Sequence, residues 1–233
     1  MKLPTIILVV FAVTCSTMAE AQPSTRLTVL VDLSRSFAPL RDQDTRALRA
    51  IGEAIPALIQ NEDWPQSAVV VFATIVDSAL NTTMPCRSIE YKPTLVGVGK
   101  SGIRRPTELT KAIGECVDRL VGMSQTPSQW TDISGAISMA SRWGKDEPGR
   151  KWLVVLSDFD ESIPSNFKPL ALKLSGEDCL LLYRPNANAL REPGPYLEGI
   201  TRWKDHLKEA GAGKVSDMAI AGATAALLQQ QLR

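Results

Sequence analysis

The sequence LTVLVDLSRS, residues 27–36, decides the fold of this chain. Its first five residues are apolar or β-branched at consecutive positions, a pattern typical of a parallel strand that is covered on both faces. The strand leads directly into Asp32, and hydroxyl side chains follow at Ser34 and Ser36. Because open α/β sheets bind ligands at the carboxyl ends of their strands, we expect these three side chains to point into one crevice.

Other apolar runs of similar length predict further strands of the same sheet. They cover residues 68–75, 152–156 and 179–183, and a short edge strand is expected near residues 89–92. Between these runs, apolar side chains recur every three or four residues, which predicts amphipathic helices. The helices are expected near residues 48–58, 109–120, 133–140, 196–210 and 217–232. Alternating strands and helices indicate the α/β class, with an open central sheet and helices on both faces.

The N-terminus has the features of an export signal. A positively charged start precedes an uninterrupted apolar run over residues 6–13, and Ala-Glu-Ala at residues 19–21 has the form of a cleavage site. We therefore predict a signal peptide over residues 1–21. Residues 22–233 are predicted to form one domain, because one hydrophobic core can serve a chain of this length. The predicted location is outside the cytoplasm, either periplasmic or extracellular.

Composition argues against two classes of partner. Lys and Arg number 26 and Asp and Glu number 25, which leaves no bulk charge to attract nucleic acid or an anionic lipid surface. No apolar run approaches the roughly 20 residues that span a bilayer. The mature chain is therefore predicted to have no membrane span.

Three cysteines remain after the predicted cleavage site, and in an oxidising compartment they allow one disulfide and one free thiol. Cys179 opens an apolar strand, which favours its burial as a small hydrophobic residue. Cys86 lies in a loop-like stretch, and Cys116 lies within a helical pattern. Cys86 with Cys116 is then the favoured disulfide, although three cysteines allow three pairs.

Two more oxygen side chains follow predicted elements at comparable places. Thr131 stands just before the helix near residues 133–140, and Asp158 follows the strand at residues 152–156. Carboxylate and hydroxyl oxygens without sulfur or imidazole suit Mg²⁺ or Mn²⁺, and they suit Ca²⁺ less well because it takes more ligands. Together with the three side chains of residues 32–36, they predict a metal site that leaves one position open for a partner's carboxylate.

The set Asp32-x-Ser34-x-Ser36, Thr131 and Asp158 resembles the metal-ion-dependent adhesion site of von Willebrand factor A (VWA) domains. The resemblance covers nearly the whole mature chain. It implies a Rossmann-like fold whose central sheet is mostly parallel, with one antiparallel edge strand. It also implies that these five residues hold one divalent ion, and that the exported protein binds a partner protein through this ion and is not an enzyme.

The chain departs from the family pattern at two positions. Family members often have glycine just before the threonine and just after the last aspartate, where this chain has Gln129-Trp130 and Phe159. The departure bears on the loop backbone rather than on the ligands, because all five oxygen donors are present. Trp130 would contact a partner or pack against the domain. Asp160 and Glu161 would support the ligands or be solvated, and neither is expected to be a ligand.

Two other interpretations stay open. The sequence LVVLSDFDES, residues 153–162, resembles the first motif of haloacid-dehalogenase-type phosphatases, in which Asp158 would be the nucleophile and Asp160 the acid/base, with Mg²⁺ alongside. That motif normally opens its domain, whereas here it comes after two thirds of the chain. The second is a metal-free scaffold of the same fold, in which the hydroxyls cap helices, as Thr131 is expected to do in either case.

Overall fold

The structure of this protein is a computed structural model. It describes residues 24–93, 102–146, 148–165, 167 and 170–233. The predicted signal peptide therefore lies outside the described residues.

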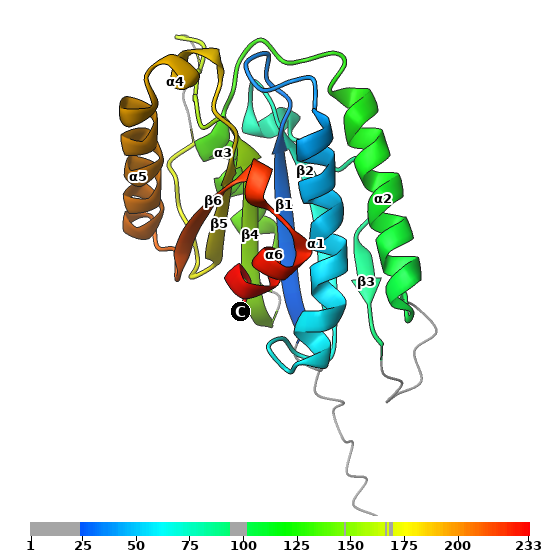
Figure 1. Cartoon of the computed structure of the whole chain (residues 1–233). Helices are drawn as coiled ribbons and strands as arrows, with labels where there is room; N and C mark the ends of the chain where they lie inside the picture. The colour runs from blue at the N-terminus through cyan, green and yellow to red at the C-terminus, as the bar shows by residue number, and fades with distance from the viewer. Residues whose placement is uncertain (1–23, 94–101, 147, 166, 168–169) are drawn as a thin grey trace, which may run out of the picture.

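A six-stranded sheet forms the centre of the molecule (Figure 1). Its strands are β1 (Ser24–Asp32), β2 (Ala68–Ile75), β3 (Ile89–Tyr91), β4 (Gly149–Ser157), β5 (Asp178–Tyr183) and β6 (Val215–Ala219). They stand in the order β3-β2-β1-β4-β5-β6. Neighbouring strands are parallel except β2 and β3, which are antiparallel. The predicted mostly parallel sheet with one antiparallel edge strand is thus confirmed.

Helices cover both faces of this sheet, as predicted. They are α1 (Asp42–Gln60), α2 (Pro106–Met123), α3 (Ile133–Trp143), α4 (Ala187–Arg191), α5 (Pro193–Glu209) and α6 (Ala225–Gln231), with 3₁₀ turns η1 (Ala79–Asn81) and η2 (Ile220–Gly222). Side chains of α1, α2 and α6 pack in one hydrophobic cluster, and those of α3 and α5 pack in another. In Figure 1, α1, α2 and α6 lie in front of the sheet and α3 lies behind it. No described helix has both the length and the hydropathy needed to cross a membrane.

Strand β1 lies between β2 and β4, at the centre of the sheet. Its Leu27, Val29 and Val31 belong to the cluster of α1, whereas Leu30 belongs to the cluster of α3, and all four are fully buried. Burial on both faces explains why apolar residues occupy consecutive rather than alternating positions in this strand. The strand brings Asp32 to the carboxyl edge of the sheet, beside the end of β4.

Cys86 and Cys116 form a disulfide, which links the segment before β3 to α2. The two cysteines are 30 residues apart. A covalent loop of this size typically stabilises a fold by about 3–4 kcal/mol, because it restricts the unfolded chain. Cys179 is a buried free thiol, and burial raises its pKa to about 12. The favoured pairing is therefore confirmed.

The predicted helix at residues 217–232 is wrong in its first half. Val215–Ala219 form strand β6, and α6 begins only at Ala225, with the Thr224 side chain accepting a hydrogen bond from the backbone of the first turn. Pairing with β5 gives the β6 backbone its hydrogen bonds, and the Asp217 carboxylate accepts a bond of 2.5 Å from Lys204 of α5. Such tertiary contacts override the local apolar spacing that predicted a helix.

Candidate metal site

The ends of β1 and β4 bring two carboxylates to one edge of the sheet. The two strands are parallel, with Val31 opposite Leu156, so Asp32 and Asp158 both follow this last pair. Asp32 is fully buried, and Asp158 is 1 % exposed. Each of these carboxylates therefore needs hydrogen bonds or a counter-charge, because an isolated buried charge is costly.

Asp32 has hydrogen-bond donors at both oxygens. Its Oδ1 accepts a bond of 2.8 Å from the backbone N–H of Ser34, and its Oδ2 accepts one of 2.6 Å from the Ser157 hydroxyl. Ser157 was not among the predicted site residues. The only signal for it in the sequence is its place immediately before Asp158, at the end of a strand.

The two serines after β1 extend the cluster toward the surface. The Ser34 and Ser36 hydroxyl oxygens are 3.2 Å apart. Ser34 is buried, whereas Ser36 is exposed. The nearby Ser36 hydroxyl lowers the pKa of Asp158, against the larger effect of burial, which raises it. Asp32, Ser34, Ser36 and Asp158 therefore form one connected group, as the sequence predicted.

Asp158 keeps an oxygen without a partner. One of its oxygens, Oδ1, accepts a bond of 3.2 Å from the backbone N–H of Asp160. The other, Oδ2, is buried and has no hydrogen-bond partner within the described part of the chain. A buried oxygen of this kind costs about 1–3 kcal/mol or more if it stays unsatisfied.

The residue after Asp158 takes the backbone conformation that favours glycine. Phe159 has a φ of 59°, which costs a non-glycine residue about 1–2 kcal/mol. Its side chain is buried against Trp203, with ring centroids 5.9 Å apart, and its carbonyl accepts a bond of 3.1 Å from the Trp203 indole N–H. The loop after β4 thus has the conformation that a glycine would take, and these contacts with α5 hold it there.

Backbone hydrogen bonds of residues 128–131 link Thr131 to the loop after β1 and to the loop after β4. It exchanges two backbone hydrogen bonds with Ser162, of 2.7 and 3.0 Å, in the segment after Asp158. Ser128 lies on the other side, where its N–H donates to Leu33 and its carbonyl accepts from Arg35. The Thr131 side chain is buried. The segment 128–131 therefore lies between the loop after β1 and the loop after β4.

The expectation that Thr131 caps α3 is wrong. The cap is Asp132, whose Oδ1 accepts a bond of 2.8 Å from the N–H of Gly135 and whose Oδ2 accepts one of 2.8 Å from Ala79. Glu161 also binds this helix start, because its carboxylate accepts from the N–H and hydroxyl of Ser134 at 2.7 and 3.0 Å. Capping thus does not account for the Thr131 hydroxyl, and Glu161 fixes the loop after β4 to α3.

The serines are not caps either. Helix α1 begins at Asp42, and its first turn is closed by Asp44, whose Oδ2 accepts a bond of 2.7 Å from the backbone N–H of Arg41. Ser34 and Ser36 stand well before this turn. The helix-capping explanation therefore fails for all three hydroxyl residues of the predicted site.

Charge in this group is poorly compensated. Burial, followed by the negative charge of Asp158, raises the pKa of Asp32 to about 7. Burial likewise raises the pKa of Asp158. Both shifts mean that the site disfavours two ionised carboxylates on their own and would favour them beside a cation. No group of three or more His, Cys, Asp or Glu side chains that could hold a metal occurs among the described residues. The candidate donors are two carboxylates and three hydroxyls, a set that suits Mg²⁺ or Mn²⁺.

Arg184, directly after β5, anchors the loop that carries the serines. Its guanidinium is 5 % exposed, forms an ion pair of 3.2 Å with buried Asp44 of α1 and donates a hydrogen bond to the carbonyl of Phe37. It also lies over the Phe37 ring, 4.1 Å from its centroid. Arg184 thereby connects β5, the start of α1 and the residue that follows Ser36.

The similarity to one pilus adhesin of known structure supports the fold. No protein-family model matches the sequence, and no curated protein matches it. The pilus adhesin SpaC of Lactobacillus rhamnosus GG, in its open conformation, is similar over 91 % of this chain and 30 % of its own, at 11 % identity and a TM-score of 0.51. The human COPII-coat protein Sec24c aligns with 92 % of this chain and 33 % of its own, at 10 % identity and a TM-score of 0.43.

A third similar structure is proximal thread matrix protein 1 from the mussel byssus, solved with a zinc-occupied metal-ion-dependent adhesion site. It aligns with 91 % of this chain and 45 % of its own, at 9 % identity and a TM-score of 0.39. The present chain thus spans less than half the length of each of these three proteins.

Proposed function

We propose that this chain is an exported protein of the VWA type that binds one divalent cation and, through it, a partner protein. The ligands would be Asp32, Ser34, Ser36, Thr131 and Asp158. The observation that carries the proposal is the burial of two carboxylates at one edge of the sheet, with Oδ2 of Asp158 lacking a hydrogen-bond partner among the described residues.

Magnesium or manganese fits this group better than calcium. The donors are few and are all oxygen, and an octahedral ion that keeps water ligands needs no more than these. A bound Mg²⁺ or Mn²⁺ would neutralise Asp32 and Asp158, satisfy the free oxygen and offer a vacant position to an incoming carboxylate. Because Ser36 is exposed while Asp32 and Ser34 are buried, the group opens to solvent on the side of Ser36.

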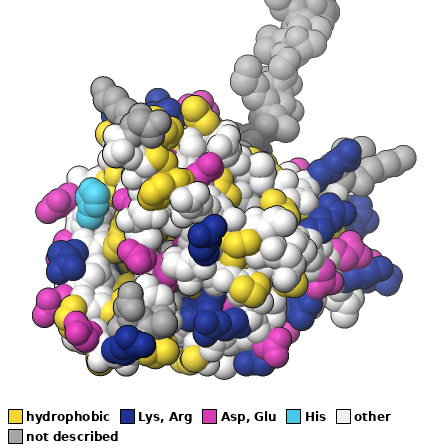
Figure 2. Space-filling model, turned by 90° about the horizontal axis from the view of Figure 1, so that it is seen from above, with side chains coloured by type: hydrophobic (Ala, Val, Ile, Leu, Met, Phe, Trp, Pro, Cys, Tyr) yellow, Lys and Arg dark blue, Asp and Glu magenta, His cyan; other side chains and the backbone are white. Residues whose placement is uncertain are grey.

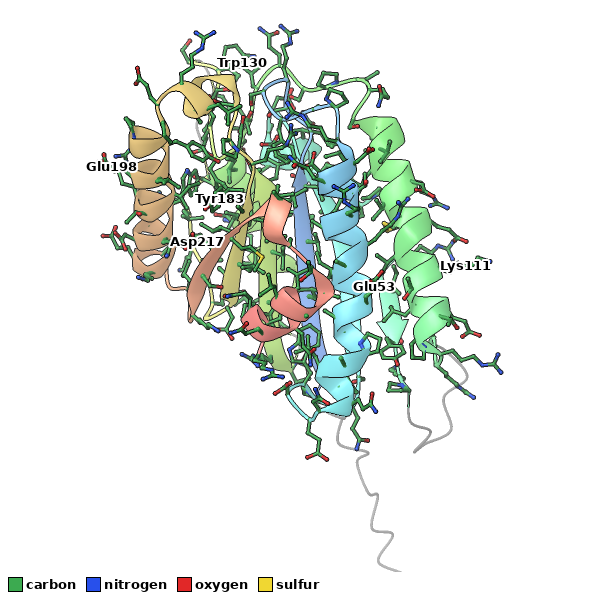
Figure 3. The ribbon with its side chains drawn as sticks, viewed as in Figure 1. Glu53, Lys111, Trp130, Tyr183, Glu198 and Asp217 are labelled. Atoms are coloured by element: carbon green, nitrogen blue, oxygen red, sulfur yellow. A yellow bond between two sulfur atoms is a disulfide. The ribbon has the colours of Figure 1, made fainter. Side chains whose placement is uncertain are left out.

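The surface around this opening suits contact with a protein. Trp130 is 36 % exposed and lies at the upper end of the molecule in Figure 3, directly before Thr131 in the chain. Leu190 of α4 is 71 % exposed. Figure 2 shows hydrophobic, acidic and basic side chains on the face seen from above. Large apolar side chains among polar ones are the usual composition of a protein interface.

Binding accounts for the site better than phosphoryl chemistry does. The pocket beside Asp158 is also lined by Asp160 and Glu192, and no described Lys, Arg or His lines it. A phosphate ester entering there would face the carboxylates of Asp158, Asp160 and Glu192. We therefore propose that the protein is not an enzyme. The disulfide between Cys86 and Cys116 supports export, because disulfides persist in oxidising compartments.

A thermal-shift experiment tests the metal. Protein stripped with chelator should melt at a higher temperature when millimolar Mg²⁺ or Mn²⁺ is added, because the ion binds only the folded state. Asp158→Asn should abolish the rise, whereas Asp205→Asn, at an exposed position of α5, should keep it. Hydrolysis of p-nitrophenyl phosphate that is lost in Asp158→Asn would instead favour the phosphatase.

The vacant position is tested separately with Mn²⁺. Water protons relax quickly at a bound Mn²⁺ that has exchangeable water ligands, so acetate that replaces such a water should lower the relaxation rate. Acetate that leaves the rate of the Mn²⁺-loaded protein unchanged would contradict carboxylate binding at the ion, even if the ion itself binds.

A further inference from the structure

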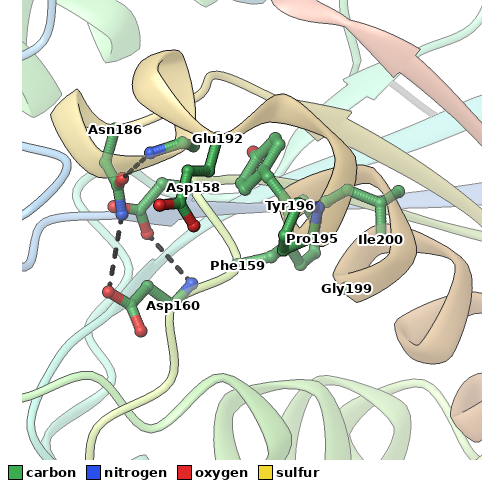
Figure 4. Close-up of a pocket in the computed structure, with 10 residues that line it drawn as sticks. Asp158, Phe159, Asp160, Asn186, Glu192, Pro195, Tyr196, Gly199 and Ile200 are labelled. Atoms are coloured by element: carbon green, nitrogen blue, oxygen red, sulfur yellow. Dashed lines mark hydrogen bonds between the residues drawn. The ribbon is translucent and has the colours of Figure 1, made fainter.

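The pocket beside Asp158 adjoins the proposed cation site. Its volume is about 290 Å³, and its walls come from the loop after β4, from Asn186 and α4, and from the first turns of α5 (Figure 4). Asp158 belongs to both places, since it is a proposed metal ligand and also lines this pocket. A ligand in the pocket would therefore lie next to whatever is bound at the cation.

All charged side chains that line this pocket are acidic. They are Asp158, Asp160 and Glu192. Asp160 and Glu192 are exposed and form no ion pair with any described residue. A divalent cation would cancel the charges of Asp32 and Asp158. The charges of Asp160 and Glu192 would remain, and they would attract a positively charged group.

Two polar atoms in the pocket lining are buried, and neither has a hydrogen-bond partner in the part of the chain that the structure describes. One is the hydroxyl of Tyr196, and the other is Oδ2 of Asp158. Burial and the nearby charge of Asp158 raise the pKa of Tyr196, so its hydroxyl stays neutral at physiological pH. The two atoms form no hydrogen bond with each other, although Asp158 and Tyr196 line the same pocket. A ligand that brings N–H groups between them would satisfy the Tyr196 hydroxyl, which the cation site does not use.

The acidic groups are spread out rather than converging on one point. No three acidic, His or Cys side chains among the described residues are close enough to hold a metal ion. Figure 4 shows Asp158, Asp160 and Glu192 on one side of the pocket and Tyr196 with Ile200 on the other. A planar group with several N–H donors fits such an arrangement better than a point charge does, and an aliphatic stem fits the apolar side.

We propose that this pocket binds the guanidinium group of an arginine side chain. This proposal rests on the proposed function in one respect, because the arginine would belong to the partner whose carboxylate reaches the cation. Asp160 and Glu192 face the guanidinium, Tyr196 accepts one of its N–H groups, and the ring of Phe159 and the side chain of Ile200 contact its stem. Partner recognition thus requires a basic and an acidic residue close together on the partner surface.

The pocket can be tested without metal. The probe is n-propylguanidinium, titrated into ¹⁵N-labelled protein in excess chelator while the backbone amide signals of Ala189, Gly199 and Ile200 are followed. We expect saturable shifts of these signals and at least tenfold weaker binding in the double variant Asp160→Asn/Glu192→Gln. Both residues are exposed, so the variant should fold. Tyr196→Phe should also weaken binding.

Glu198→Gln is the matched control. Glu198 is an exposed acid of α5 that does not line the pocket and lies on the outer side of the molecule in Figure 3. Its variant should bind the probe as the unaltered protein does. Equal weakening by Glu198→Gln would show that only general charge attracts the probe, and would overturn the proposal.

Two comparison probes sharpen the outcome. Shifts produced equally by n-butanol would show a merely apolar pocket, and binding of n-butylammonium as tight as that of n-propylguanidinium would overturn the guanidinium assignment. If Mg²⁺ binds the protein but n-propylguanidinium does not, the pocket proposal fails and the cation site stands. If n-propylguanidinium binds but no divalent ion does, the proposed function fails and the pocket stands.

Discussion

The hydroxyl of Ser157 on β4 donates a hydrogen bond of 2.6 Å to Oδ2 of Asp32 on β1. Together with the bond from the Ser34 N–H, it fixes both oxygens of a carboxylate that has no exposed surface. Asp158 differs from Asp32 because one of its two oxygens has no hydrogen-bond partner within the described ranges. Ser157 thus holds Asp32 in one orientation at the proposed cation site.

Ser157→Ala should weaken the metal site without removing a ligand. Loss of the donor leaves Oδ2 of Asp32 buried and without this hydrogen bond. Substitution of a residue that orients a metal ligand typically lowers the metal affinity by about 10–100-fold. We expect this loss of Mn²⁺ affinity in calorimetry, together with a decrease of about 1–3 kcal/mol in the free energy of unfolding in chelator. Ser157→Thr, which keeps the hydroxyl, should restore the affinity. An affinity in Ser157→Ala equal to that of the unaltered protein would contradict this role.

The raised pKa of Asp32 predicts how stability depends on pH in the absence of metal. Its pKa is about 7 in the folded protein, against about 3.9 in an unfolded chain. The folded state therefore holds this proton more tightly, and its contribution to stability, present below pH 4, is lost as the pH rises toward 7. Melting temperatures measured in chelator between pH 5 and pH 8 should fall with pH.

Two controls distinguish this effect from other titrations. Asp32→Asn should flatten the pH dependence, because the amide does not titrate. Saturating Mg²⁺ should also reduce the fall, since the ion favours the ionised carboxylate. A fall in melting temperature of equal size in Asp32→Asn would assign the pH dependence to other groups.

Arg184→Met should destabilise the fold more than an ordinary surface change. The substitution leaves Asp44, which is fully buried, without its ion-pair partner, and it removes the hydrogen bond to Phe37. Breaking one side of a buried ion pair costs about 3–5 kcal/mol. Urea unfolding would measure this loss. Adding Asp44→Asn to Arg184→Met should recover part of it, and strictly additive losses would show that the two residues are not coupled.

The sequence predicted the elements whose signals are local. The five consecutive apolar or β-branched residues before Asp32 indicated a strand covered on both faces, and Cys179 in an apolar run indicated a buried thiol. The pattern of Asp32, Ser34 and Ser36 likewise sufficed to predict that these side chains and Asp158 cluster, because parallel strands end at the same edge of a sheet. These features depend on the chain near each residue and on one general rule of α/β folds.

Other features depend on which segments meet, and local patterns do not contain that information. The Ser157 hydroxyl can donate its hydrogen bond to Asp32 only because β1 and β4 are neighbours in this register. Asp132 rather than Thr131 caps α3, since its side chain also accepts a bond from Ala79 of η1. Residues 215–219 form a strand because β5 offers them an edge. The pocket beside Asp158 is lined by segments that are far apart along the chain, since Tyr196 and Ile200 lie more than 35 residues after Asp158.

Isothermal titration calorimetry of chelator-stripped protein with Mn²⁺ and Mg²⁺ would show whether the chain binds a divalent ion through these residues. We expect saturable binding of one ion per chain, abolished by Asp158→Asn and retained by Asp205→Asn. Absence of binding for Mg²⁺, Mn²⁺ and Ca²⁺ alike, or binding that Asp158→Asn leaves unchanged, would contradict it.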